Sequence, residues 1–285
     1  MSMSEIKISI TDHASANLNA RIERLQVNAE PLTLDSHTEA ILFLRGAGSR
    51  ASLALPAFYL LLGARSCYFP EHAAPYSTVV RAHSLRFSSA STISLCCRKI
   101  FDCSKSNKMT GKRFAKIADA NLEEVAQYWS KISGKSKEDV TSALVFLREI
   151  FRKCSKPEKE LLKETSLLER RVGLLKVHAN REAAHLSIEP FLFDIVDVAH
   201  VVASMAMIGT IIHGFDNPAS SVSYFDSLDK ASWESGKSIF PGMSAPRLFE
   251  QVDIGMHATN SWRFDSGVNW LMNELPGAIG WWESH

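Results

Sequence analysis

The stretch from Leu174 to Ser187 reads Leu-Leu-Lys-Val-His-Ala-Asn-Arg-Glu-Ala-Ala-His-Leu-Ser. It contains three side chains that can contact a phosphodiester, those of His178, Arg181 and His185. These positions are spaced three and then four residues apart, so they share one face of a helix if the helix extends that far. An arginine offers a permanent planar cation to phosphate oxygens, and a histidine can transfer a proton near neutral pH. This face is therefore a candidate for RNA cleavage, although the same spacing is common on solvated helix surfaces.

The second half of this stretch, Asn180 to Ser187, ends one long predicted helix and precedes an apolar helix predicted to begin near Pro190. In this arrangement it resembles the signature of the HEPN superfamily. The segment from Ser91 to Phe114, a predicted helix followed by a polar break, is similar to the part that precedes the signature in the abortive-infection branch of that superfamily. Together the two matches cover about residues 35–214.

The resemblance implies an all-α fold, an antiparallel helical bundle of the HEPN type. Many members of the superfamily are metal-independent ribonucleases that act as toxins in toxin–antitoxin systems or in antiviral defence by abortive infection. The resemblance therefore implies a ribonuclease that needs no metal and no other cofactor and leaves 2′,3′-cyclic phosphate ends. It also implies a homodimer, because in the family two copies of the motif compose the site. The implied partners are an RNA substrate and an antitoxin or other defence protein.

The chain departs from the family at the position that matters most. The family pattern is an arginine, four to six intervening residues and then a histidine. If His185 is that histidine, the arginine is expected where this chain has His178, Ala179 or Asn180, and Arg181 is one residue too close. Because Arg-Asn commonly opens the motif, Ala179 occupies the position expected to be arginine. Three explanations stay open: the arginine has been lost, Arg181 replaces it, or the chain carries a deliberate arginine-to-alanine change.

The resemblance assigns the phosphate contact to Arg181 or to an arginine missing at position 179. It assigns proton exchange with the ribose 2′-hydroxyl or the leaving oxygen to His185, with His178 and Asn180 as neighbouring site residues. We then expect weak or no cleavage by the chain as written, and an Ala179→Arg variant should create or restore it. One subgroup of the family has a tyrosine two residues after the histidine, which a nucleotidyltransferase antitoxin modifies. Ser187 at that position argues against such a partner.

A second function fits the same residues, namely a non-catalytic helical module that binds protein or RNA and keeps the motif as a relic. The absent arginine favours this alternative, whereas the retained Asn180 and His185 favour the ribonuclease. The residue that the native gene encodes at position 179 would separate the two.

The charge of the chain is distributed unevenly. Its 285 residues are 46% hydrophobic, enough for a sizeable core, and carry a net charge of only +1. Residues 215–285 contain four Lys or Arg against nine Asp or Glu, whereas in 98–116 only Asp102 opposes seven cations. This basic segment predicts a surface for an RNA backbone, against the alternative of an ordinary solvated face. The predicted RNA-binding residues are Arg98, Lys99, Lys105, Lys108, Lys112, Arg113 and Lys116.

Cysteine spacing and the length of the apolar runs indicate the cellular compartment in which the protein is expected. The five cysteines, at positions 67, 96, 97, 103 and 154, form no Cys-x-x-Cys pair, so neither a zinc site nor a disulfide framework is indicated. We expect buried thiols in a reducing cytoplasm, without a secretion signal at Met1 to Ile10. The longest apolar run, Val198 to Ile212, is shorter than the roughly twenty residues that span a bilayer, so we expect a buried helix and no membrane partner.

Hydrophobic periodicity predicts helices through most of residues 1–214 and no convincing strand. Gly46 and Gly48 are expected in a turn, and Ser155 is expected to cap a helix that runs to the motif, with Leu161, Leu168, Val172 and Leu175 as its core stripe. That helix should pack antiparallel to the next, with the motif at their turn. The expected helices are 12–29, 34–44, 50–65, 76–103, 111–118, 121–132, 136–153, one from 156 through the motif, and 191–213.

The C-terminal quarter differs in composition. Proline, glycine and serine are frequent in it, and it holds five of the six tryptophans. We therefore expect two domains, a helical HEPN-like domain at 1–214 and an irregular, acidic, Trp-rich extension at 215–285 with short helices at 245–256 and 267–274. Exposed tryptophan is unfavourable, so these side chains should pack on the body or bind a partner.

Overall fold

The computed structural model of the protein describes residues 36–66, 76–104, 110–185, 194–216, 221–251 and 270–274. Within these ranges it describes the backbone alone at 36–37, 76–80, 83, 181–185, 221–223, 251, 270 and 274. Every regular element in the described ranges is helical, and they contain no strand, so the predicted all-α class is confirmed. The helix predicted at 12–29 lies outside them.

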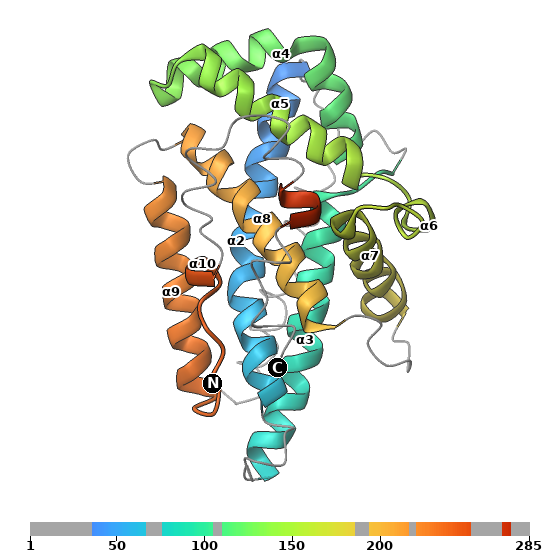
Figure 1. Ribbon diagram of the computed structural model, residues 1–285, viewed down its shortest axis with the longest axis vertical. Helices are drawn as coiled ribbons and strands as arrows, with labels where there is room; N and C mark the ends of the chain where they lie inside the picture. Colours follow the sequence, from blue (N-terminus) through green and yellow to red (C-terminus); the bar gives the residue numbers. More distant parts are fainter. Residues whose placement is uncertain are drawn as a thin grey trace, which may run out of the picture. The chain divides into compact units, whose positions relative to one another are not determined.

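Ten elements are described, and α2 makes the most extensive contacts with the others (Figure 1). It packs against α3, α4, α8 and α9, while α7 lies along α3 and α4 pairs with α5. In chain order the elements are α2 (Ser36–Ser66), α3 (Tyr76–Ile100), α4 (Gly111–Ser133), α5 (Lys137–Cys154), α6 (Glu158–Leu161), α7 (Leu167–His185), α8 (Ile195–Asp216), α9 (Ser221–Ile239), α10 (Leu248–Gln251) and the π-helical turn η1 (Trp270–Glu274).

Helix α2 runs unbroken through Gly46 and Gly48, so the turn predicted there is wrong. Close helix packing explains one of these glycines. A Cβ atom at Gly48 would lie 3.3 Å from Cγ2 of Ile212, and one at Gly209 of α8 would lie 2.9 Å from Cβ of Ala51. Small residues on both helices therefore let the backbones of α2 and α8 approach closely, and glycine here serves packing rather than a change of chain direction.

Helix α8 is the buried helix that the apolar run predicted. In the most apolar 18-residue stretch of this helix, 94% is buried inside the fold. Among the described helices it is the one that is long and apolar enough to cross a membrane by length and composition. Nearly every side chain of α8 therefore contacts other parts of this chain.

The two short helices predicted at 111–118 and 121–132 are halves of one kinked helix, α4. Asn121 interrupts it with φ −131° and ψ 28°. Gly134 ends it in the left-handed region at φ 66°, where its N–H donates to the carbonyl of Ser130. The side chain of Ser136 then caps α5 by accepting a hydrogen bond from the N–H of Asp139, close to the predicted start.

The single helix predicted from position 156 is two elements, α6 and α7, separated by residues 162–166. The hydroxyl of Ser166 accepts a hydrogen bond from the N–H of Glu169 at 3.4 Å. Ser-x-x-Glu is the sequence of a capping box, so a helix start is encoded here that the prediction overlooked. Ser155 does not cap α6, because Pro157 occupies that position and Ser155 Oγ is buried among the described atoms without a hydrogen-bond partner.

The core stripe predicted for this region is confirmed, because Leu161, Leu168, Val172 and Leu175 are all fully buried. The contact between α7 and α8 lies at a different place along α7 than predicted. Arg171, near the start of α7, ion-pairs with Asp197, near the start of α8. Because fourteen residues, or about 21 Å of helix, separate Arg171 from His185, the end of α7 extends well past this junction and the motif does not lie at a tight hairpin turn.

The sequence prediction missed helix α9, which forms within the segment expected to be irregular. Its buried positions, Phe225, Asp229, Ser232 and Gly236, recur at helical spacing, but only one of them is a large apolar residue. Trp233 donates from Nε1 to the carbonyl of Ala245 at 2.7 Å and packs against the core, so the expected packing on the body is confirmed for this tryptophan. The domain boundary at 214 stays a prediction.

Candidate functional site

The backbone of α7 is helical through His185. The condition under which His178, Arg181 and His185 share one helix face is therefore met. The side chains of Arg181 and His185 lie outside the described ones, so their positions are known from the backbone alone. The residues immediately before them are described in full and show how α7 is held.

The imidazole of His178 is buried between α7 and α3. It is 1% exposed, and its Nδ1 lies 2.8 Å from Oγ of Ser94, which is fully buried. A hydrogen bond between two buried side chains links the helices and keeps both groups away from water. His178, a predicted site residue, therefore lies where it can position α7 but not where it can contact RNA.

Lys176, which the sequence analysis did not single out, is a second anchor. The residue is 3% exposed, and its ammonium donates to the carbonyls of Phe101, at 3.1 Å, and Lys156, at 2.6 Å. Sγ of Cys103 lies 3.8 Å from the same nitrogen. Because a buried charge is tolerated only when it is paired or hydrogen-bonded, this arrangement ties α7 to the end of α3 and to the turn before α6.

The next two residues of the motif differ in exposure. Asn180 is half-buried and donates from Nδ2 to the Glu158 carboxylate at 2.7 Å, which adds a tie between α7 and α6. Ala179 is fully buried. An arginine at position 179 would have to fit a long cationic side chain into this enclosed space, so Arg181 becomes the better candidate for the phosphate contact.

The predicted RNA-binding residues divide into groups. Lys105 and Lys108 lie outside the described ranges, and Arg98 is half-buried. The guanidinium of Arg113 makes hydrogen bonds of 2.8 and 3.0 Å to both carboxylate oxygens of Glu39 on α2, so it ties α4 to α2 rather than facing an RNA strand. The three that remain exposed are Lys99, Lys112 and Lys116.

A buried histidine on α8 connects α7 to η1. His200 Nε2 lies 2.8 Å from the carbonyl of Leu271, and Nδ1 lies 3.0 Å from the Arg171 guanidinium. These partners fit a neutral ring in which Nε2–H donates and Nδ1 accepts. Burial lowers the pKa of His200 to about 4, and the Arg171 cation acts in the same direction, while the bond to Leu271 opposes it.

We expect acid to weaken the fold through His200. The unfolded chain binds a proton at this residue near pH 6.5 and the folded chain only near pH 4, so falling pH favours unfolding. Between pH 7 and pH 5 the protein should lose about 2 kcal/mol of unfolding free energy from this group. Urea titrations at both pH values measure the loss. A His200→Gln variant should lack this component, and an unchanged pH dependence in that variant would contradict the assignment.

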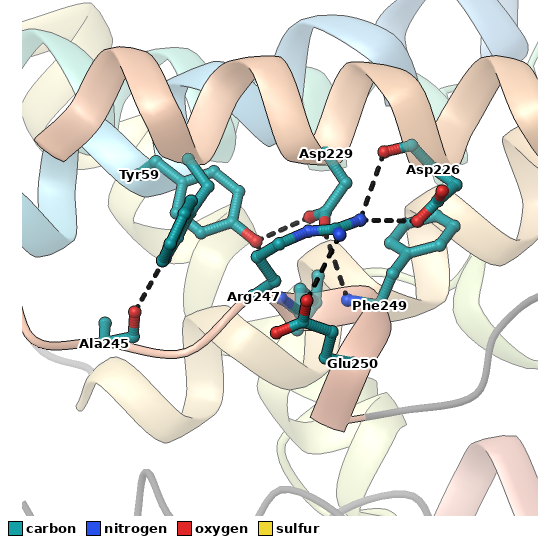
Figure 2. Close-up of polar contacts among 9 residues, drawn as sticks. Tyr59, Asp226, Asp229, Ala245, Arg247, Phe249 and Glu250 are labelled. Carbon is teal, nitrogen blue, oxygen red and sulfur yellow. Dashed lines mark hydrogen bonds and ion pairs between the residues drawn. The ribbon is translucent and has the colours of Figure 1, made fainter. Parts of the chain in front are cut away.

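A polar cluster that the sequence analysis missed fixes residues 245–250 to α9 and α2 (Figure 2). At its centre is the fully buried carboxylate of Asp229, which accepts hydrogen bonds from the Tyr59 hydroxyl at 2.5 Å and the Arg247 guanidinium at 3.2 Å. Figure 2 shows the Arg247 side chain between Asp226 and Asp229, and it ion-pairs with both. Burial raises the pKa of the Asp229 carboxyl, and the bonds from Tyr59 and Arg247 oppose that rise.

Tyr59 has a double role in this cluster, because its hydroxyl also accepts the N–H of Leu248 at 2.7 Å. Removing it with Tyr59→Phe should cost about 2 kcal/mol of unfolding free energy, since a buried carboxylate loses a donor and a buried N–H loses its acceptor. The matched control is Tyr224→Phe, at a tyrosine that is 41% exposed, which should change stability by less than about 0.5 kcal/mol. If urea titrations gave the same loss of unfolding free energy for both variants, the buried hydrogen bonds of Tyr59 would not contribute to stability.

The described cysteines are free thiols, and three of the four are buried. Burial raises the pKa of Cys97 to about 12 and also raises that of Cys154. The expectation of buried thiols is therefore confirmed for Cys96, Cys97 and Cys154, whereas Cys103 is partly exposed. Cys67 lies outside the described ranges.

Comparisons of this chain with protein-family models, with curated proteins and with solved structures found no match. The candidate site therefore rests on the geometry of the chain itself. It comprises the last turn of α7, the buried contacts that hold α7, and the exposed lysines at the neighbouring helix ends.

Proposed function

We propose that the protein is a metal-independent ribonuclease of the HEPN type that acts in prokaryotic phage defence or in a toxin–antitoxin system. The observation that carries the proposal is the helical backbone from Arg181 to His185. Residues four apart on a helix have Cβ atoms about 5–6 Å from each other, so a cation and an imidazole there can reach one phosphodiester. Both residue types suit the chemistry of RNA cleavage without further groups.

The roles follow from how charge and protons move in that reaction. His185 accepts the proton of the ribose 2′-hydroxyl, whose oxygen attacks the neighbouring phosphorus. The guanidinium of Arg181 donates hydrogen bonds to the phosphoryl oxygens, on which negative charge accumulates. The 5′-oxygen leaves with a proton, and the products are a 2′,3′-cyclic phosphate and a 5′-hydroxyl. In a homodimer His185 of a second copy would supply the proton to the leaving oxygen.

The contacts of α7 support this proposal, because catalysis needs the reacting groups held in place. Lys176, His178 and Asn180 tie the helix to α3, α6 and the turn before α6 through buried or half-buried hydrogen bonds. These three residues lie within the five positions before Arg181. Their contacts hold the approach to the last turn of α7 against the rest of the fold.

The test uses total RNA in EDTA with three proteins: the unchanged chain, Arg181→Ala and Arg170→Ala. Arg170 is an exposed arginine on the same helix, so its variant controls for loss of charge from α7. The family motif led to an expectation of weak or no cleavage, but the burial of Ala179 leaves Arg181 as the candidate for the phosphate contact. We therefore now expect cleavage with 2′,3′-cyclic ends from the unchanged chain and from Arg170→Ala, and a loss in Arg181→Ala. Cleavage that needs a divalent metal, or equal activity of all three proteins, would reject the proposal. Sedimentation tests the homodimer, whose interface should bury upwards of about 1,200 Å².

The burial of Ala179 and His178 favours a second function, a non-catalytic helical module that binds protein or RNA. If the family arginine belongs at position 179, this chain has neither the residue nor an exposed place for it. RNA binding without any cleavage in the same assay would support this alternative.

A further inference from the structure

Three helix ends meet at Gly111, the first residue of α4. A Cβ atom there would lie 2.1 Å from Oγ of Ser155 and 3.0 Å from the carbonyl oxygen of Ile100. Only glycine allows the start of α4 to approach the end of α3 and the end of α5 so closely. The ring of Phe151 on α5, at 5.9 Å from Phe101 and 5.2 Å from Phe114, fills the space beneath this junction.

Exposed cations gather at this junction. We call Lys99, in the last turn of α3, and Lys112 and Lys116, in the first two turns of α4, the lysine surface. The N–H of Lys112 donates to the carbonyl of Asp102 at 3.4 Å, which places the two helix ends side by side. Lys112 and Lys116 are one helical turn apart, so their ammonium groups project from the same face of α4.

The lysine surface differs from the other basic residues around it. The described residues contain no ion-pair partner for Lys99, Lys112 or Lys116, whereas Arg113 pairs with Glu39 and Arg152 with Glu149. The nearby carboxylate of Asp102 accepts the N–H and the hydroxyl of Ser104, which reduces its attraction for the lysines. Three positive charges therefore remain available to an anionic partner.

We propose that the lysine surface binds the phosphate backbone of single-stranded RNA, the substrate class of the proposed ribonuclease on which this inference rests. Lysine acts on phosphate as a point charge, so the contact is electrostatic and independent of sequence. Two lysines one turn apart contact neighbouring phosphates of one strand. Lys176 fixes α7 to the carbonyl of Phe101, two residues after Lys99, so RNA on the lysine surface is held against the same body as the last turn of α7.

The binding experiment uses fluorescent 2′-O-methyl RNA, which cannot be cleaved through its 2′-oxygen, at several salt concentrations. Removing one lysine–phosphate interaction should reduce the slope of log affinity against log salt by about 0.7, so Lys99→Gln/Lys112→Gln/Lys116→Gln should reduce it by about 2. The matched control is Lys131→Gln/Lys135→Gln/Lys230→Gln, three exposed lysines away from the junction. We expect the control to keep the slope of the unchanged chain.

Several outcomes would overturn the inference: no RNA binding by the unchanged chain, equal losses of affinity in the two triple variants, or equally tight, equally lysine-dependent binding of polyglutamate. Polyglutamate binding of that kind would assign the surface to acidic protein instead. Because the probe cannot be cleaved, the result does not depend on catalysis. Binding through the lysine surface without cleavage of natural RNA would reject the ribonuclease alone, and cleavage without a change of slope would reject the lysine surface alone.

Discussion

A His185→Ala variant is expected to cleave RNA about 10²–10⁴-fold more slowly than the unchanged chain, because it lacks the group that accepts the 2′-hydroxyl proton. His185 is the last residue of α7, so alanine there removes the imidazole while the helix behind it keeps its hydrogen bonds. Initial rates on a fluorescent single-stranded RNA in EDTA measure the effect. Arg170→Ala serves again as the control on the same helix and should retain the full rate.

Thermal unfolding of His185→Ala should match that of the unchanged chain, which separates an effect on the chemistry from an effect on the fold. A variant that folds normally and cleaves at the unchanged rate would remove the ribonuclease proposal and leave the binding module in its place. If the unchanged chain itself is silent, the same conclusion follows, provided that RNA binding is retained.

Ala179→Arg is expected to lower the free energy of unfolding by about 4 kcal/mol or more. Ala179 is fully buried, so arginine must displace packed neighbours, which typically costs about 1–3 kcal/mol. It must also bring a charge out of water into this enclosed position, which costs several kcal/mol more. Urea titration measures the change. Ala231→Arg, at an exposed alanine of α9, is the matched control and should stay within about 0.5 kcal/mol.

This outcome would revise the expectation drawn from the family motif, in which arginine at position 179 creates or restores activity. A stable Ala179→Arg protein that gains His185-dependent cleavage would instead show that the packing around position 179 rearranges to accommodate arginine. The missing family arginine would then be the correct explanation, and Arg181 would lose its proposed role.

Local sequence patterns predicted the helices well because their information lies within a few residues. Leu161, Leu168, Val172 and Leu175 repeat at helical spacing, and all four are buried as expected. The errors came from residues whose local meaning is ambiguous. Glycine at position 48 suggests a turn by its flexibility, yet in α2 it makes room for Ile212, 164 positions later in the chain.

Exposure of the candidate site depends on contacts that sequence spacing does not reveal. The motif placed His178 on the same helix face as Arg181 and His185, but Ser94, 84 residues earlier, buries its imidazole. Tyr59 and Asp229 meet across 170 residues, and neither has a motif around it. The sequence predicted the helix and the residue types on it. It could not predict which of those side chains are exposed to solvent.

The buried ammonium of Lys176 also has a consequence for local unfolding. Its two carbonyl acceptors belong to Phe101 and Lys156, so three segments far apart in the sequence satisfy one charge. If any segment opens alone, the cation keeps only part of its hydrogen bonds in a site closed to water, which raises the free energy of that partial opening. The end of α3, the turn before α6 and the middle of α7 should therefore open together, and their amide hydrogens should exchange with solvent at a shared free energy.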